Sequence, residues 1–342
     1  MPIRMQEQQY GLAFRPQTDI ATANTDAQFW RLRKVNAQLP IPALQTQNDA
    51  AEYGKGNPYA SQVFPIAWRS HGSLEKYLSA EIAAWAMAFG LGKAVNTGTA
   101  PNFVYTCTPL NPSNGTDPAE LPYFTVAAQI RPGASAAADY AVIGCAVNSW
   151  QITLGSGPGR DNSKIAIEYA GSGRFTEPSG ISLPTDTLAE KLLLSASLSF
   201  AAHGTDYITA RRLVSLEVGW QNNLMADMGY YPGSGIQNGA AVAGRLMFGV
   251  QSASVRFTAL LEQSSPEFAR LRQQTEGTAV ITLTHDVNNS LQLTFHRVVV
   301  SALEFGETDG FATIQCELTP LWDSTNGLLT AVAKCNIDNI GA

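Results

Sequence analysis

Alternation of apolar and polar residues predicts a β-hairpin in the middle of the chain. Apolar side chains take every second position over Trp150–Leu154 and again over Ile165–Tyr169, and a glycine-rich turn, Gly155–Gly159, separates the two runs. A period of two places successive side chains on opposite faces of a strand. Both runs therefore offer one apolar face to a core, and the hairpin is expected to span residues 140–169.

A second hairpin is predicted near the end of the chain, around the turn dipeptide Asp309-Gly310. An Asp-Gly pair between apolar runs is a strong signal for a two-residue turn. If this turn sets the register, Leu303 lies opposite Cys316. Phe305 then lies opposite Ile314, so apolar side chains meet on one buried face.

The two hairpins have matching surroundings, which indicates an internal duplication of architecture. The first copy begins with an extended segment at 29–47 and continues through loop Asn48–Gln62, a strand at 63–69, a helix and a strand to its hairpin. The second begins with a strand at 207–220 and continues through loop Gln221–Gly239, strands within 242–261, a helix and a strand to its own hairpin. We therefore expect a mainly β fold with two tandem β-sandwich or barrel domains.

One flanking α-helix is expected in each copy. In the first, Ser73 is the expected N-cap. The apolar residues that share one face of this helix are Leu74, Leu78, Ile82, Trp85 and Phe89. In the second, Ser265-Pro266-Glu267 combines a cap, a proline at the first helical position and an acid in the first turn. Phe268 and Leu271 are then expected to point inward.

The predicted boundaries follow from composition. Residues 1–174 form the first domain, with a Gly/Thr/Asn/Pro-rich insertion at 90–122 that the second copy lacks. Residues 175–190 form a linker, and residues 191–342 form the second domain with a C-terminal extension.

Charge and composition narrow the function classes. Charged residues make up 15% of the chain, against roughly 25% in ordinary soluble proteins. A neutral surface suits a protein that buries itself against copies of itself. The net charge is −6 and no basic run exceeds Arg211-Arg212, so tight nucleic-acid binding is disfavoured, although DNA can still pass nearby.

No catalytic residue, cofactor or metal site is predicted. The four histidines lack metal-ligand spacing, and the four cysteines, which we expect to be reduced thiols, form no C-x-x-C pair. The glycine-rich segments contain no nucleophile elbow. The start of the chain lacks the apolar core of a signal peptide, and no apolar stretch is long enough to span a bilayer. A soluble protein made in the cytosol is expected.

The two long loops are instead expected to make contacts between subunits, because loops of this length inside compact domains are usually functional or disordered. The candidate assembly residues are Asn48, Asp49, Glu52, Asn57, Asn222, Asn223, Asp227, Tyr230 and Tyr231.

Several loose patterns along the chain carry a resemblance to a family. They are Gln8–Phe14, Ala88–Gly92, Val147–Leu154 with Ile165–Gly173, Leu216–Leu224 and Arg297–Val300. With these patterns the chain resembles the larger major tail tube proteins of siphophages, the bacteriophages with long non-contractile tails.

The resemblance implies a non-enzymatic subunit whose stacked rings form the tail tube in the virion, assembled in the host cytoplasm. In that family, long strands of neighbouring subunits join into an inner barrel, loops bridge the rings, and DNA crosses the lumen without specific binding. Further partners would be the tail terminator, tape measure and distal tail proteins. Two tube domains per chain favour a ring of three chains, whereas a hexamer would follow if one domain only decorated the outside.

Two other classes stay open. One is a different phage β-rich structural protein, such as a capsid, decoration or tail adaptor protein. The other is a carbohydrate-binding or hydrolytic β-sandwich. The missing catalytic constellation disfavours a hydrolase, and the tryptophans lie mostly in patterns that predict burial, which disfavours a lectin.

Overall fold

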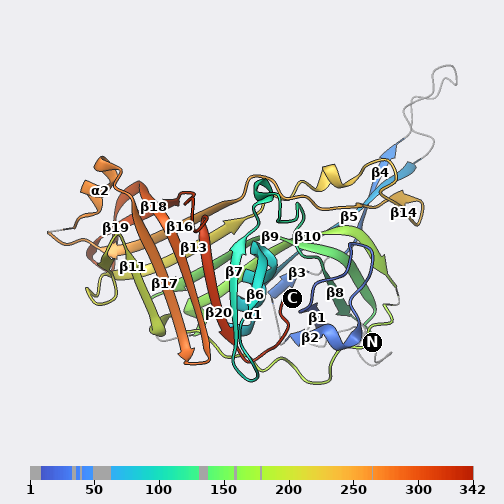
Figure 1. Cartoon of the computed structure of the whole chain (residues 1–342), viewed down its shortest axis with the longest axis horizontal. Helices are drawn as coiled ribbons and strands as arrows, with labels where there is room; N and C mark the ends of the chain where they lie inside the picture. The colour runs from blue at the N-terminus through green and yellow to red at the C-terminus, as the bar shows by residue number, and fades with distance from the viewer. Residues whose placement is uncertain are drawn as a thin grey trace, which may run out of the picture.

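The computed structural model describes residues 9–32, 36–38, 41–48, 63–130, 138–157, 160–177, 179–263 and 265–341 (Figure 1). Strands dominate this part of the chain, which holds two α-helices, α1 (Ala80–Leu91) and α2 (Glu267–Gln273). The mainly β class predicted from the sequence is confirmed.

One long antiparallel sheet, here called the long sheet, runs through both halves of the chain. Its strands in spatial order are β3 (Asn36–Gln38) and β4 (Ala43–Asn48), then β5 (Val63–Tyr77), β10 (Ser163–Thr176), β9 (Tyr140–Gly155), β13 (Leu213–Gln221), β16 (Ser252–Leu260), β19 (Phe311–Pro320) and β18 (Asn289–Thr308). Apolar side chains on one face of these strands are buried and polar ones lie on the other face, as period-two alternation requires.

Shorter sheets branch from the long sheet. The first consists of β2 (Phe29–Leu32), β1 (Gln9–Ala13) and β8 (Phe124–Gln129), which pairs with the start of β9. The second consists of β6 (Gly92–Asn96), β7 (Phe103–Pro109), β20 (Leu329–Cys335), the first part of β18, β17 (Gly277–Asp286), β11 (Leu198–Ala202) and β12 (Thr205–Asp206). The predicted insertion at 90–122 thus supplies β6 and β7.

Helix α1 is buried on every side, not on one face as predicted. It contacts β9 on one side and β6, β7 and β20 on others. Its N-cap is Ser79, whose Oγ accepts a hydrogen bond from the Ile82 amide at 3.3 Å. The predicted cap at Ser73 is wrong, because Ser73 and Leu74 belong to β5. Pairing with β10 continues β5 as far as Tyr77.

The first predicted hairpin is formed by β9 and β10, and the register predicted for the second hairpin is confirmed. Ile152 lies opposite Ile165 in the first hairpin. In the second, Leu303 lies opposite Cys316 and Phe305 opposite Ile314. The prediction that this whole face is buried is wrong at the tip, because Phe305 is 68% exposed.

Helix α2 begins after Pro266, which itself takes the N-cap position predicted for Ser265. Phe268 is 52% exposed, so its predicted inward orientation is wrong, whereas Leu271 packs against the core. The first residue of the helix, Glu267, is buried and forms an ion pair with Arg212, with 3.0 Å between Oε1 and Nη1.

The two halves of the chain are continuous with each other. Strand β9 of the first half pairs with β13 of the second, and β7 pairs with β20. One hydrophobic cluster draws residues from both halves. The predicted strand at 207–220 begins only at Leu213, and residues 242–250 hold only an isolated bridge at Met247. The structure therefore does not confirm two separate domains.

Candidate assembly surfaces

The long sheet ends in β3 and β4 on one side and in β18 on the other, and within the described residues β3, β4 and residues 299–308 of β18 each pair on one side only. At one end, β4 pairs only with β5. At the other, residues 299–308 of β18 pair only with β19. Natural sheets protect such edges with charged residues, proline or β-bulges. Neither lysine nor proline occurs in β4 or in residues 299–308, although the second edge carries Glu304 and Glu307 and each edge has one register shift. Within the described residues no further strand covers either edge.

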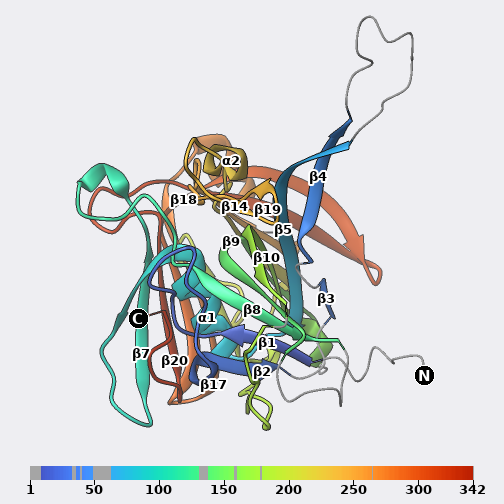
Figure 2. The same cartoon turned by 90° about the vertical axis from the view of Figure 1, so that its right-hand side faces the viewer.

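The first edge belongs to an arm, which we define as β4 together with residues 63–67 of β5. Figures 1 and 2 show the arm projecting away from the body. Its large exposed apolar side chains are Leu44, Val63, Phe64 and Ile66. A two-stranded ribbon is marginally stable alone, and an exposed apolar group of this size is typical of an interaction site.

The second edge ends in the hairpin tip between β18 and β19, where Phe305 and Phe311 are both exposed. Figure 1 shows the arm and this end of β19 at opposite ends of the molecule. The chain thus carries two different, separated edges, which is the requirement for a head-to-tail contact between identical copies.

The predicted loop at 221–239 lies against its own chain, and Asn222 is fully buried in it. The Asn222 amide nitrogen donates to the carbonyls of Gly90 at 2.8 Å and Val147 at 3.0 Å. Its oxygen accepts from Trp220 and Gln251, both at 3.0 Å. The side chain of Asn222 is a core polar group with no surface to present to another subunit.

The other predicted assembly residues in this loop lie at the surface. Asn223 and Asp227 are exposed, and Asp227 forms an ion pair with Arg69. Tyr230 is half-buried, which raises its pKa, and Tyr231 is exposed. In the other predicted loop, Asn48 ends β4, whereas Asp49, Glu52 and Asn57 lie outside the described residues.

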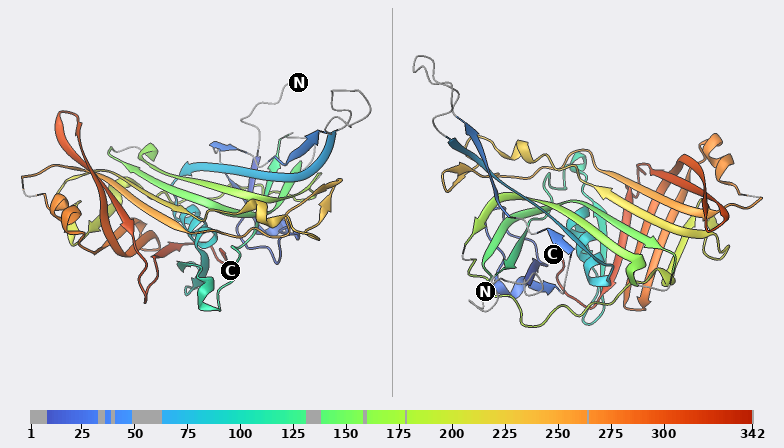
Figure 3. Two further views of the ribbon diagram at one scale, coloured as in Figure 1. Left: turned by 90° about the horizontal axis from the view of Figure 1, so that it is seen from above. Right: turned by 180° about the vertical axis from the view of Figure 1, so that it is seen from behind.

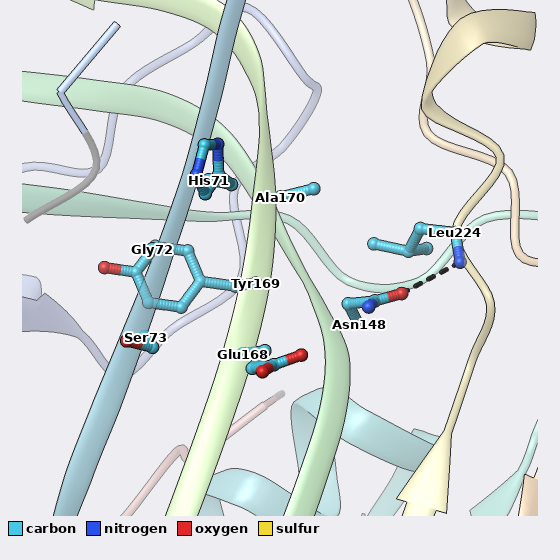
Figure 4. A pocket seen from close by; sticks show the side chains of 8 residues that line it. All are labelled: His71, Gly72, Ser73, Asn148, Glu168, Tyr169, Ala170 and Leu224. Atoms are coloured by element: carbon cyan, nitrogen blue, oxygen red, sulfur yellow. Dashed lines mark hydrogen bonds between the residues drawn. The ribbon is translucent and has the colours of Figure 1, made fainter. Parts of the chain in front are cut away.

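The polar face of the long sheet is hollowed where β5, β9 and β10 meet (Figure 4). This pocket of about 300 Å³ is lined by His71, Ser73, Asn148 and Glu168, among others. Glu168 accepts a hydrogen bond from the Ser149 hydroxyl at 3.1 Å. Within the described residues no hydrogen bond joins Ser73 to His71.

Acidic and basic side chains alternate across the strands of this polar face. Arg256 lies opposite Glu217 on β13 and Glu317 on β19, and its ion pair to Glu317 measures 3.2 Å. Lys164 pairs with Glu75 at 3.5 Å. Exposed pairs of this kind add little stability, but they neutralise the bases.

The described residues contain no cluster of His, Cys, Asp or Glu that could hold a metal ion. No helix in the same part of the chain is long and apolar enough to cross a membrane. The chain matches no known protein family and no curated protein in sequence.

Proposed function

We propose that this chain is a structural subunit that polymerises into stacked rings of the kind that form a siphophage tail tube. The observation that carries the proposal is the long sheet with an open edge at each end. Pairing of residues 299–308 of one copy with β4 of the next would satisfy the free main-chain groups of both strands. Repeated around a ring, this head-to-tail contact joins the long sheets of successive copies into one barrel.

The polar face of the long sheet supports a role as a conduit for DNA. The apolar face is covered by the core, so the polar face is the one available to line a lumen. DNA is held by Lys and Arg through release of counterions. On this face Arg256 and Lys164 are each paired with a glutamate, which offsets the positive charge that would otherwise attract a phosphate.

Both halves of the chain contribute strands to the long sheet. Three chains would then supply six half-chain positions around one ring, which favours a trimer over a hexamer. The proposed partners are further copies of this chain in the ring and in adjacent rings, together with the tail terminator, tape measure and distal tail proteins of the virion.

The test is assembly of the purified chain at high concentration, followed by negative-stain microscopy and sedimentation velocity. We expect tubes or stacked rings from the wild type. Gln45→Lys combined with Gln47→Lys places two charges on the open β4 strand and should leave folded monomers. Thr116→Lys combined with Ala119→Lys adds the same two charges at exposed positions far from β4 in sequence; this control should assemble normally. A wild type that stays monomeric contradicts the proposal.

A further inference from the structure

Residues 222–250, here called the strap, connect β13 to β16 by a long detour to the base of the arm. Their regular elements are a 3-10 helix, Ala226–Gly229, and the short strands β14 (Ile236–Gln237) and β15 (Ala240–Ala241). Figures 1 and 3 show β14 beside β5, after which the strap returns along the molecule to β16. A direct connection between two adjacent antiparallel strands needs only a few residues, so the detour calls for an explanation.

The strap holds β5 at the point where the arm leaves the body. Tyr230 donates its hydroxyl to the main-chain carbonyl of Trp68 at 2.5 Å. The Trp68 indole donates to the main-chain carbonyl of Gln237 at 2.9 Å. Ala241 pairs with Ala67 in a parallel bridge. The strap thus binds both the main chain and the side chain of Trp68, and the main chain of Ala67, in β5.

The same part of the strap is tied to β10. The Gln237 side chain brackets the main chain of Phe175, accepting from its amide at 3.3 Å and donating to its carbonyl at 2.5 Å. Arg174 donates to the main-chain carbonyls of Ser234, at 2.9 Å, and Ala243. The Phe175 ring also packs edge-on against Trp68, with 5.0 Å between ring centroids. Through these contacts the strap connects the base of the arm to β10 of the long sheet.

Burial changes abruptly at this point. Residues 63–66 of β5 are exposed, whereas Ala67 is buried. Beyond the strap the arm is a two-stranded ribbon without further support from the described residues, so its direction is set by the contacts around residues 67–69.

We propose that Tyr230 and Gln237 are positioning residues, and that the strap fixes the angle at which the arm leaves the body. Only the consequence for assembly rests on the proposed function: a fixed arm presents Leu44 and Phe64 to the next subunit at one angle, without an entropic cost on binding. The positioning itself is a property of the single chain.

The test is a distance between two spin labels in the monomer, one at Thr46→Cys on the arm and one at Thr153→Cys on β9. The four native cysteines are buried, so labelling is confined to the introduced sites. We expect one narrow distance peak from the wild-type background. Tyr230→Phe combined with Gln237→Leu should give a broad distribution.

Tyr105→Phe is the matched control for the tyrosine. It also removes a hydroxyl, which donates to the carbonyl of Ile337 and accepts from the amide of Ile340, and it should keep the narrow peak. Tyr230→Phe alone is the milder variant and should broaden the peak in part if the double variant unfolds. A peak that stays narrow in a folded Tyr230→Phe/Gln237→Leu variant overturns the proposal. Because the measurement is made on monomers, this result is independent of whether the wild type forms tubes.

Discussion

Replacing Asn222 with alanine should destabilise the fold rather than block assembly. The substitution removes two hydrogen bonds to the carbonyls of Gly90 and Val147. It also removes the two that Asn222 accepts from Trp220 and Gln251. Each bond contributes about 1 kcal/mol net, so we expect a loss of about 4 kcal/mol in the free energy of unfolding. Domains have only about 5–15 kcal/mol in total.

The assay is urea denaturation followed by tryptophan fluorescence. The matched control is the neighbouring Asn223→Ala, because Asn223 is exposed and makes one side-chain hydrogen bond, to the Val250 carbonyl at 2.6 Å. Its backbone has a φ of 50°, which disfavours alanine, so a loss of about 1–2 kcal/mol is expected. If Asn222→Ala unfolds within 1 kcal/mol of wild type and yet stops tube formation, Asn222 acts in assembly and our reasoning is refuted.

Three further predictions follow from buried groups. Burial raises the pKa of Cys107, Cys316 and Cys335 to about 12, so a thiol reagent at neutral pH should label them only after unfolding; rapid labelling of the folded chain would contradict this. Burial also raises the pKa of Glu81 above its usual 4.5. The folded chain is therefore destabilised as the pH rises through this raised pKa and Glu81 becomes charged. Glu81→Gln should raise the melting temperature relative to wild type more at about pH 7 than at about pH 4, and an equal effect at both would count against it. Glu267→Gln leaves the buried Arg212 without its closest carboxylate and should cost about 3–5 kcal/mol in urea denaturation. A loss below about 1 kcal/mol would contradict this and leave Glu262, whose Oε2 lies 3.8 Å from the Arg212 Nε, as the sufficient partner.

Local signals in the sequence predicted the hairpins well. The Asp309-Gly310 turn allows one register, and the structure has Leu303 opposite Cys316 as that register demands. Burial was harder, because alternation shows which residues share a face but not whether anything covers it. Phe305 lies on the predicted face and is exposed, since the hairpin extends beyond the core.

The start of the first helix could not be read from periodicity alone. Ser73 and Ser79 are both capable caps, and the apolar residues after Ser73 fit a helix. Pairing of residues 70–77 with β10 extends the strand instead. The deciding partner is about a hundred residues away in sequence, and no local pattern records it.

The assembly residues were predicted from loop composition, which likewise contains no information about partners that are distant in sequence. Asparagine is common in turns, and Asn222 follows a strand as expected. Its partners Gly90 and Val147 are 132 and 75 residues away, so only the fold shows that it is buried. The edge positions of β4 and β18 could not be predicted from local sequence either, because a strand is an edge strand only when no other strand pairs with its second side.

The most direct test of the account is a reconstruction of the tube formed by the purified chain. We predict threefold rings in which residues 299–308 of one copy lie beside β4 of the next, with Glu217 and Arg256 facing the lumen. Sixfold rings of this chain would contradict the trimer. A tube whose polar sheet face points outward, or whose subunits meet away from these two strands, would contradict the account itself.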